Sequence, residues 1–210
     1  SKTLTLEPDR ITWGAVEALK EETDAEVVPS YDLIAGLRRE KDPAEVARIE
    51  KAAVVADEAI AQVLHELAEE PTEIEFARSL DSAMFDRGAE ALSFETICAS
   101  GPNAASPHAR PSNRIIGSGD SVVLDFGAVI DGYHSDMTRT YIVGGAGHSF
   151  EDVVRTVTEA QQRGCEVVRP GVKASEVDEA CRSYLADKGL GDYFVHGTGH
   201  GVGLEIHEAP

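Results

Sequence analysis

The sequence contains few cysteines, few aromatic residues and few lysines. Its three cysteines, Cys98, Cys165 and Cys181, are odd in number and widely spaced. This pattern favours reduced side chains that pack in the interior over a disulfide framework. We therefore expect a protein of a reducing compartment.

Basic residues are also scarce. Nineteen lysines and arginines stand against 38 aspartates and glutamates, so the 210 residues carry a formal net charge of -19. A charge of this sign repels both nucleic-acid backbones and anionic membrane surfaces. No apolar run reaches the ~18 residues that a membrane helix needs, and the first residues lack the apolar core of a signal peptide. We expect a cytoplasmic protein that binds neither nucleic acid nor membrane.

The beginning of the chain has the pattern of a strand, a helix and a second strand, over residues 2–6, 11–22 and 25–28. A unit this short cannot bury a core by itself. We therefore predict that residues 1–35 are the end of an N-terminal domain that begins before this sequence. Residues 36–210 are then expected to form a second domain.

Two amphipathic helices are predicted next. Pro43 stands at a first helical position, and apolar side chains then recur every three or four residues as far as Leu67. The predicted buried stripe consists of Val46, Ile49, Ala53, Ala56, Ile60 and Leu64. The second helix begins with a capping box formed by Thr72 and Glu75 and ends near Gly88.

After Phe94 the pattern changes to strands and tight turns. The predicted elements are strands over 94–99, 121–129 and 133–143, helices over 151–168 and 174–188, and a strand from Phe194. An Asp131-Gly132 pair joins the second and third strands as a two-residue hairpin turn. Two helices, a strand and a hairpin are thus followed by two helices and a strand, an order that indicates two similar halves.

The hairpin brings two carboxylates to one face of the sheet. With the Asp131-Gly132 turn at its centre, Asp136 lies opposite Gly127, a residue that leaves room beside the carboxylate. Asp125 is then a diagonal neighbour of Asp136, with Cβ atoms roughly 7–8 Å apart. Two carboxylates at this separation can bind divalent cations between them. The alternative is that both are solvated on an exposed face, and a β-bulge would change the register.

Residues 196–208 combine three histidines, two glutamates and four glycines. Glycine allows close approach of the backbone, and histidine binds metals and transfers protons near neutral pH. The spacing of His200 and His207 differs from that of an HExxH zinc motif, and no lysine follows the glycines as in a nucleotide-binding loop. A lone histidine is more often structural, but three of them between glycines indicate a site.

Two motifs in this sequence resemble those of a known enzyme family. The first is Leu124-Asp-Phe-Gly-Ala followed by Ser135-Asp-Met-Thr-Arg-Thr, and the second is Gly199-His-Gly-Val-Gly-Leu-Glu-Ile-His-Glu. Together they resemble the proline-specific metallopeptidases of the pita-bread fold, which include the Xaa-Pro dipeptidases (prolidases) and the Xaa-Pro aminopeptidases. The resemblance covers essentially all of the chain after residue 40. It implies the pita-bread form of an α+β fold.

The resemblance also implies a set of metal ligands. Members of the family bind two divalent metal ions, commonly Mn, Co or Zn. Asp125 matches a ligand of one ion, Asp136 matches the carboxylate that bridges both, and His200 matches a histidine ligand.

Three further histidines match positions that face the substrate. His108 matches a histidine on the substrate side, and His207 matches the histidine that contacts the scissile carbonyl. His196 matches a histidine that lines the substrate pocket. The resemblance implies a substrate that is an Xaa-Pro dipeptide, or a peptide with proline at the second position, and an enzyme that is a homodimer.

The sequence departs from the family at one point. The family's two glutamate ligands lie on strands that follow the motif of His207, and this sequence ends at Pro210. Only three of the five ligands are therefore present. We expect the 210 residues to be an inactive fragment of a peptidase, without the C-terminal part of the fold.

Other readings of the same motifs are possible. Methionine aminopeptidases share the fold, but they usually carry a cysteine where this chain has Pro107, before His108. Creatinase-type hydrolases and metal-free binding relatives usually lose metal ligands, so the presence of Asp125, Asp136 and His200 favours the proline-specific peptidases. A catalytically dead interaction module on the same scaffold remains the alternative of a different class.

Overall fold

The computed structural model describes the backbone of residues 2–145 and 148–210. The helices (α), 3-10 helices (η) and strands (β) are, in chain order, β1 (Thr3–Leu6), α1 (Trp13–Glu22), β2 (Glu26–Pro29), α2 (Leu33–Arg39), α3 (Pro43–Val63), η1 (Leu64–Glu69), α4 (Glu73–Asp86), β3 (Ala91–Leu92), β4 (Ile97–Ser100), η2 (Gly101–Ala105), β5 (Ser121–Phe126), β6 (Ala128–Ile130), β7 (Tyr133–His134), β8 (Met137–Ile142), α5 (His148–Val167), α6 (Ala174–Asp187) and η3 (Gly191–Tyr193).

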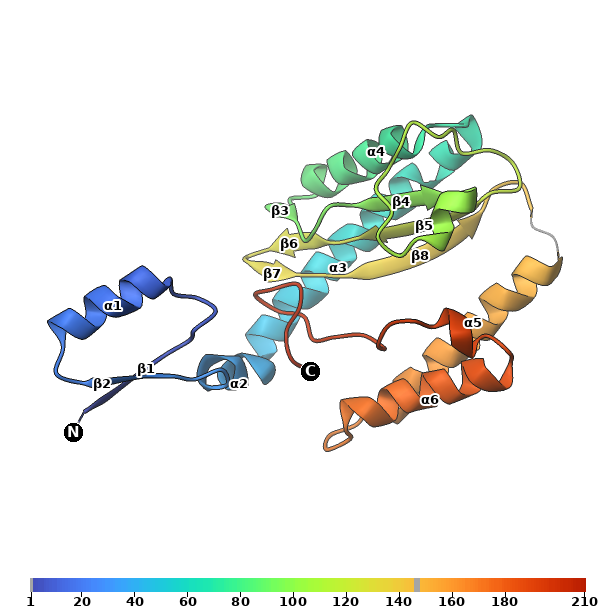
Figure 1. Ribbon diagram of the computed structural model, residues 1–210. Helices are drawn as coiled ribbons and strands as arrows, with labels where there is room; N and C mark the ends of the chain where they lie inside the picture. The colour runs from blue at the N-terminus through green and yellow to red at the C-terminus, as the bar shows by residue number, and fades with distance from the viewer. Residues whose placement is uncertain (1, 146–147) are drawn as a thin grey trace.

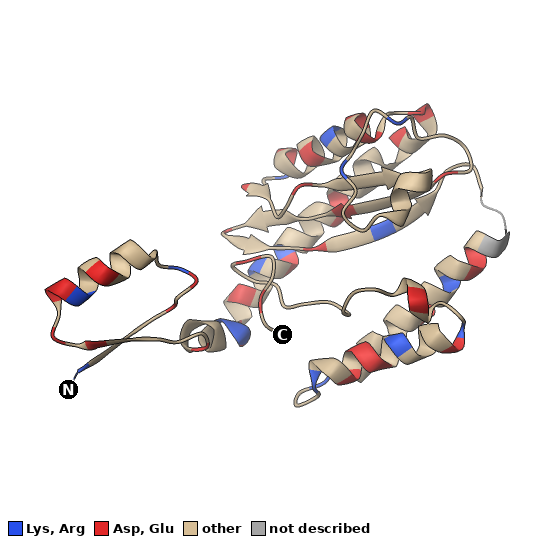
Figure 2. Cartoon of the chain, viewed as in Figure 1, with Lys and Arg blue, Asp and Glu red and all other residues tan. Residues whose placement is uncertain are grey.

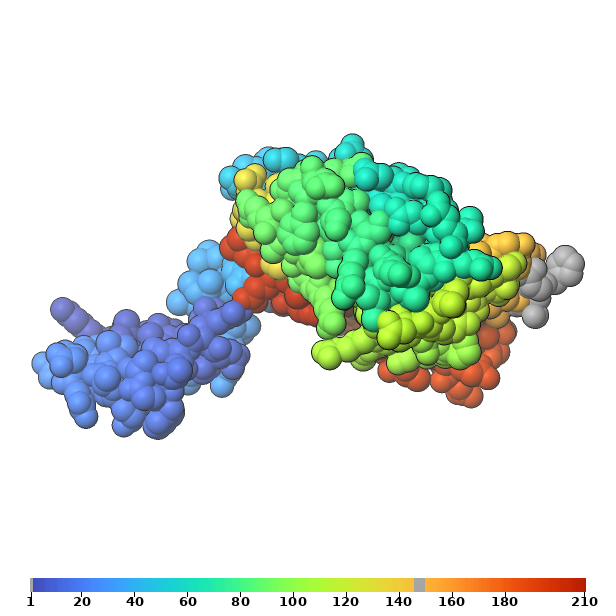
Figure 3. Space-filling view, turned by 90° about the horizontal axis from the view of Figure 1, so that it is seen from above, coloured from blue at the N-terminus to red at the C-terminus, as the bar shows by residue number. Residues whose placement is uncertain are grey.

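The N-terminal strand, helix and strand form a small unit of their own. The strand, helix and strand occur as the sequence predicted, and the structure adds that β1 and β2 pair in parallel with α1 connecting them. No residue of α1 is buried. Figures 1 and 3 show this unit as a lobe set apart from the main body, which it reaches through α2. The sequence did not predict α2, because this seven-residue helix contains Gly36 and its N-cap residue makes no side-chain capping bond.

The long helix α3 begins where the sequence places it. Asp42 and Glu45 form a capping box around Pro43. The buried stripe differs from the prediction, since Val46 is 42% exposed. The residues of α3 that are buried are Ala52, Val55, Ala56, Ala59, Ile60 and Val63. The reason is that α3 packs against both α4 and the β6–β7 pair, so it buries a broad face of mostly small side chains rather than one narrow stripe.

Two short antiparallel sheets form the centre of the main body. Their strand orders are β4-β5-β8 and β3-β6-β7, and α3 and α4 lie along them (Figure 1). Alternate residues of β5, namely Val122, Leu124 and Phe126, are fully buried in the core with Phe76 and Leu80 of α4. The residues between them therefore project from the other face of the sheet, and Asp125 is one of these.

The hairpin has the predicted register. Asp125 pairs with Thr138 in the β5–β8 ladder. The turn residues Asp131 and Gly132 have φ angles of 49° and 79°, as a type I′ turn requires. The expectation of free space opposite Asp136 was wrong, because the backbone of Ser135 already occupies the space beside Gly127.

Gly127 interrupts the hairpin between β5 and β6. A Cβ atom at Gly127 would collide with the backbone carbonyl oxygen of Ser135. The glycine is therefore needed for the close approach of two backbones, which bends the hairpin and divides it into two ladders.

The last part of the structure is a helical hairpin followed by a loop. α5 and α6 pack against each other, near the helices predicted there. The strand predicted from Phe194 was wrong: in the described residues after that position, the pairing is limited to one isolated bridge between Gly201 and Glu208. A strand needs a hydrogen-bonded neighbour along its length, and no strand of the described residues pairs with 194–200.

Charged residues are spread widely over the molecule. Figure 2 shows acidic residues on the N-terminal unit, on α3 and α4 and on α6, with basic residues scattered among them. Within the described residues, no helix combines the length and the hydrophobicity that crossing a bilayer requires.

Candidate metal and substrate site

The two hairpin carboxylates lie close enough to influence each other. Burial raises the pKa of Asp125, and the nearby negative charge of Asp136 raises it further. Thr138 acts in the opposite direction, because its hydroxyl donates a hydrogen bond of 2.7 Å to Asp125 Oδ1. A cation between the carboxylates would remove the cost of holding both charges in one place.

His200 reaches the same carboxylates from the C-terminal loop. Its Nε2 atom lies 3.1 Å from Asp136 Oδ2. Its Nδ1 atom lies 2.9 Å from the carbonyl oxygen of Gly201. A carbonyl oxygen only accepts hydrogen bonds, so Nδ1 carries a proton, and in a neutral ring Nε2 then presents a lone pair to the carboxylate.

This contact shows that the site fits a cation. A lone pair and a carboxylate oxygen at 3.1 Å repel each other unless a proton or a metal ion lies between them. The contact of Nδ1 with a backbone carbonyl is the kind of hydrogen bond that orients histidine ligands of metals. The donor set of one imidazole and two carboxylates suits divalent cations such as Zn and Mn.

The described side chains do not by themselves complete a coordination shell. In residues 2–145 and 150–210, no group of three His, Cys, Asp or Glu side chains is gathered tightly enough to hold an ion. The three predicted ligands thus form an open arrangement, in which His200 touches Asp136 and the charge of Asp136 acts on Asp125.

His207 lies beside His200. Their ring centroids are 4.2 Å apart and the ring planes are tilted by 50°. The predicted carbonyl-contacting residue therefore adjoins the predicted ligand, in the same short loop.

The other two predicted histidines lie further out. His196 is exposed, and its ring packs edge-on against Phe194 at a centroid distance of 5.0 Å. His108 is also exposed, and it lines a pocket together with Ile97 of β4. Ile97 pairs with Asp125, so this pocket opens at the end of the sheet that carries the carboxylate. Neither of these two histidines touches the predicted metal ligands in the described structure.

Helix α6 anchors the start of the histidine loop. Asp178 accepts hydrogen bonds from the amide and the hydroxyl of Thr198, at 2.9 and 3.0 Å. Arg182 donates to the carbonyl oxygens of Phe194 and His196, at 2.8 Å each. The hydrogen bond from Arg182, with those from Thr198, lowers the pKa of Asp178 to about 2 although partial burial opposes it. This pair was not predicted from the sequence, although its i, i+4 spacing on a predicted helix could have indicated it.

Glu208 anchors the end of the loop. Its side chain is 7% exposed and forms ion pairs with Arg38, at 2.5 Å, and Lys41, at 2.8 Å. Its backbone exchanges two hydrogen bonds of 2.9 Å with Gly201. Burial raises the pKa of Glu208, but its two basic partners outweigh this and lower it overall. No local pattern in the sequence indicated these partners, because they precede Glu208 by more than 160 residues.

Residues 47–210 match the family model described as metallopeptidase family M24. The chain belongs to this family. Membership of a metallopeptidase family implies divalent metal ions. This agrees with the donor set of one imidazole and two carboxylates, which suits divalent cations.

Individual M24 relatives are similar over nearly the whole chain. The Xaa-Pro dipeptidase of Pyrococcus furiosus is 40% identical over 201 residues, which are 95% of this chain and 58% of the relative. The solved structure of an Xaa-Pro dipeptidase from Bacillus anthracis is 41% identical with a TM-score of 0.95, and all of this chain matches 59% of that one. An X-Pro aminopeptidase structure from Thermotoga maritima is 33% identical, with a TM-score of 0.94, over 100% of this chain and 60% of that one.

These M24 relatives confirm the fold. The chain has the α+β pita-bread fold, with helices packed on antiparallel strands. It spans about 60% of the length of the relatives that it matches.

Proposed function

We propose that the whole protein containing these 210 residues hydrolyses the peptide bond between an N-terminal residue and proline. The substrate is an Xaa-Pro dipeptide or a longer peptide with proline at the second position. The observation that carries the proposal is the meeting of His200 Nε2 and Asp136 Oδ2 at 3.1 Å, beside Asp125, because one imidazole and two carboxylates form a donor set that suits divalent cations. Similar chains from several organisms are described as Xaa-Pro dipeptidases, which supports the choice of substrate.

The metal would be held by the residues that meet at the hairpin. We assign Asp125 and His200 as ligands of one metal ion each. We assign Asp136, which contacts His200, as the carboxylate shared by both ions. We propose two divalent ions, of Mn, Co or Zn, with two glutamate ligands from outside these 210 residues. Ions bound there would polarise the scissile carbonyl and lower the pKa of a water molecule.

The histidines act on the substrate. His207, beside His200, is assigned to donate a hydrogen bond to the scissile carbonyl oxygen, where negative charge develops during the reaction. His108 is assigned to the substrate side of the site, at the pocket that it lines with Ile97. We assign His196 to the lining of the substrate pocket. We further propose that the protein works in the cytoplasm as a homodimer.

The reaction can be tested with a pair of peptides. The whole protein with added Mn should release proline from Met-Pro and should leave Met-Ala intact. His207→Ala should lower kcat by roughly 10²–10³-fold, because it removes a donor to the developing oxyanion. His65→Ala is the matched control, since His65 is an exposed histidine on η1.

Other outcomes would redirect the proposal. Cleavage of Met-Ala at the rate of Met-Pro would point to an aminopeptidase of the methionine type. Hydrolysis of neither peptide by a protein without bound metal would indicate an interaction module on the same scaffold.

A further inference from the structure

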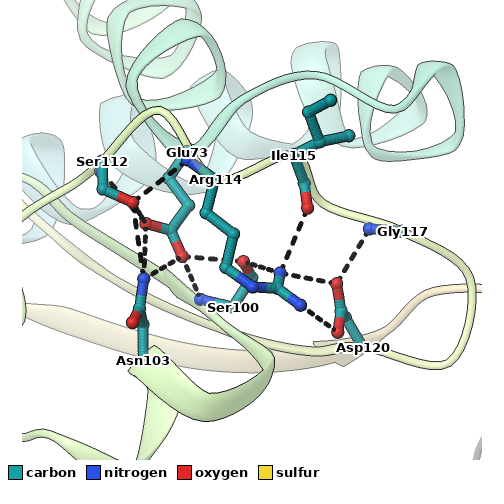
Figure 4. Close-up of polar contacts among 8 residues, drawn as sticks. All are labelled: Glu73, Ser100, Asn103, Ser112, Arg114, Ile115, Gly117 and Asp120. Carbon is teal, nitrogen blue, oxygen red and sulfur yellow. Dashed lines mark hydrogen bonds and ion pairs between the residues drawn. The ribbon is translucent and has the colours of Figure 1, made fainter.

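The first residue of α4, Glu73, is a carboxylate with no exposed surface. Figure 4 shows its two oxygens surrounded by donors from one loop. Oε1 accepts hydrogen bonds from the amide and the hydroxyl of Ser100, both at 2.7 Å. Oε2 accepts from the amide and the hydroxyl of Ser112, at 3.0 and 2.7 Å. Asn103 donates to both oxygens at 3.1 Å.

A second set of contacts surrounds this carboxylate. Arg114 donates to the hydroxyl of Ser100 at 2.6 Å and forms a bidentate ion pair with Asp120 at 2.7 and 2.8 Å. The backbone amide of Glu73 donates to the carbonyl oxygen of Arg114 at 3.0 Å. A Cβ atom at Gly101, whose φ is +50°, would collide with the Asp120 and Arg114 side chains. The arrangement thus leaves little freedom at either end of the loop.

The carboxylate is ionised in spite of its burial. Burial raises the pKa of Glu73, but the hydrogen bonds from Ser112, Ser100 and Asn103 outweigh this and lower it. An ionised carboxylate only accepts hydrogen bonds, so it can satisfy every one of these donors at once. A glutamine could not, because its NH₂ group would face N–H and O–H donors.

The contacts join the two ends of the segment that carries His108. The chain leaves β4 at Ser100 and returns at Ser112, and both residues bind the same carboxylate. Most residues between them are partly or fully exposed, and His108 is one of the exposed ones. Glu73 is therefore the buried point that fixes where this loop begins and ends.

We propose that Glu73 is a positioning residue that holds the Gly101–Ser112 loop so that His108 faces the substrate. The inference rests on the proposed function, which assigns His108 to the substrate side. Capping of α4 does not require Glu73, because Thr72 and Glu75 already form the capping box. Filling the interior does not require it either, because an apolar side chain would fill the same volume without the cost of burying a charge.

Hydrogen exchange tests the anchor in the whole protein loaded with Mn. Glu73→Gln should speed exchange at the amides of residues 101–113 by about 10–100-fold, because hydrogen bonds to a charged group are lost. Exchange in β5 should stay unchanged. Asp86→Asn is the matched control, because Asp86 is an exposed carboxylate at the other end of α4. Unchanged exchange in the loop would overturn the proposal.

A double-mutant cycle tests whether the anchor acts through His108. Glu73→Gln should lower kcat/KM for Met-Pro on the order of 10–100-fold in the wild-type background. In a His108→Ala background it should change kcat/KM by no more than about twofold, because there is no histidine left to position. An equal loss in both backgrounds would show that Glu73 only supports the fold, and would contradict the proposal.

Hydrogen exchange of the loop and hydrolysis of Met-Pro can fail independently, so the role of Glu73 and the proposed function are tested separately. Faster loop exchange in a protein that cleaves no Xaa-Pro peptide would leave the anchor in place but remove its assignment to substrate positioning. An active wild type whose loop exchange is unaffected by Glu73→Gln would keep the function and reject the anchor. If Glu73→Gln does not fold, Ser112→Ala removes one donor to the carboxylate, together with the acceptor for Asn103 and the Arg114 amide, and should give a smaller effect of the same kind.

Discussion

At the scale of single residues, the most informative atom is Nε2 of His200. The hydrogen bond between Nδ1 and the Gly201 carbonyl orients the ring, and Nε2 then faces Asp136 Oδ2 at 3.1 Å. The residue types of the motif were readable from the sequence, and so was the register that puts Asp125 and Asp136 together. The orientation of the His200 ring was not, since it depends on the backbone path of the loop.

The three cysteines differ in burial, which the sequence alone did not reveal. Cys98 and Cys181 are buried as expected, but Cys165 is exposed, so its expected interior position was wrong. Burial, with the nearby charge of Glu73, raises the pKa of Cys98 to about 12. Because thiolates are the reactive form, Cys98 should be inert at neutral pH.

Thiol titration checks this difference. A thiol reagent added to the folded protein at pH 7.5 should modify Cys165 alone among the cysteines of these 210 residues, and all three after denaturation. Rapid modification of Cys98 in the folded protein would contradict its burial. Cys165→Ser, which should remove the fast phase, identifies the reactive thiol.

At the scale of elements, local signals predicted helix starts and the hairpin turn well. The Thr72–Glu75 capping box and the Asp131-Gly132 turn are short motifs whose physics is complete within a few residues. The strand from Phe194 was predicted wrongly, because its apolar pattern says nothing about whether a neighbouring strand is present. That segment is held instead by side chains of α6.

The contribution of Asp178, on α6, to the stability of the fold depends on pH. The pKa of Asp178 falls to about 2 in the folded protein, below the value of about 3.9 in an unfolded chain. Its hydrogen bonds therefore stabilise the fold fully above about pH 5, and this contribution is lost as the pH falls through the folded pKa.

Asp178→Asn should destabilise the whole protein by about 1 kcal/mol at pH 7 and speed exchange of the Thr198 amide. The difference in stability from wild type, measured by urea denaturation, should shrink as the pH is lowered from 6 to 3. Asp187→Asn, at the exposed end of the same helix, is the control. A constant difference across this range would show that the charge of Asp178 does not contribute.

At the scale of the whole molecule, the C-terminal loop joins parts that are far apart in the sequence. Glu208 pairs with Arg38 and Lys41, and Glu205 pairs with Arg10 of the N-terminal unit. A pocket between that unit and the loop is lined by Tyr31 and His207, among others. The division of the chain at residue 35 stays a prediction. Local sequence patterns do not indicate pairs between residues this far apart in the chain. The contacts of the N-terminal unit with the C-terminal loop could therefore not be predicted from the sequence.

The open metal arrangement leads to a prediction about the 210 residues alone. In the described side chains, residues 2–145 and 150–210, no three His, Cys, Asp or Glu groups gather closely enough to hold an ion. We expect this polypeptide by itself to release no proline from Met-Pro, with or without Mn. Measurable Mn-dependent release would show that three ligands and the described loops suffice.

The most direct test of the account is the metal content of the whole protein after dialysis against metal-free buffer. We predict about two divalent ions per chain, as in two-metal hydrolases, and the loss of at least one of them in His200→Ala but not in His65→Ala. Retention of the full metal content in His200→Ala, or a wild type that binds no divalent metal when Mn is supplied, would contradict the assignment of His200, Asp125 and Asp136 as the metal site.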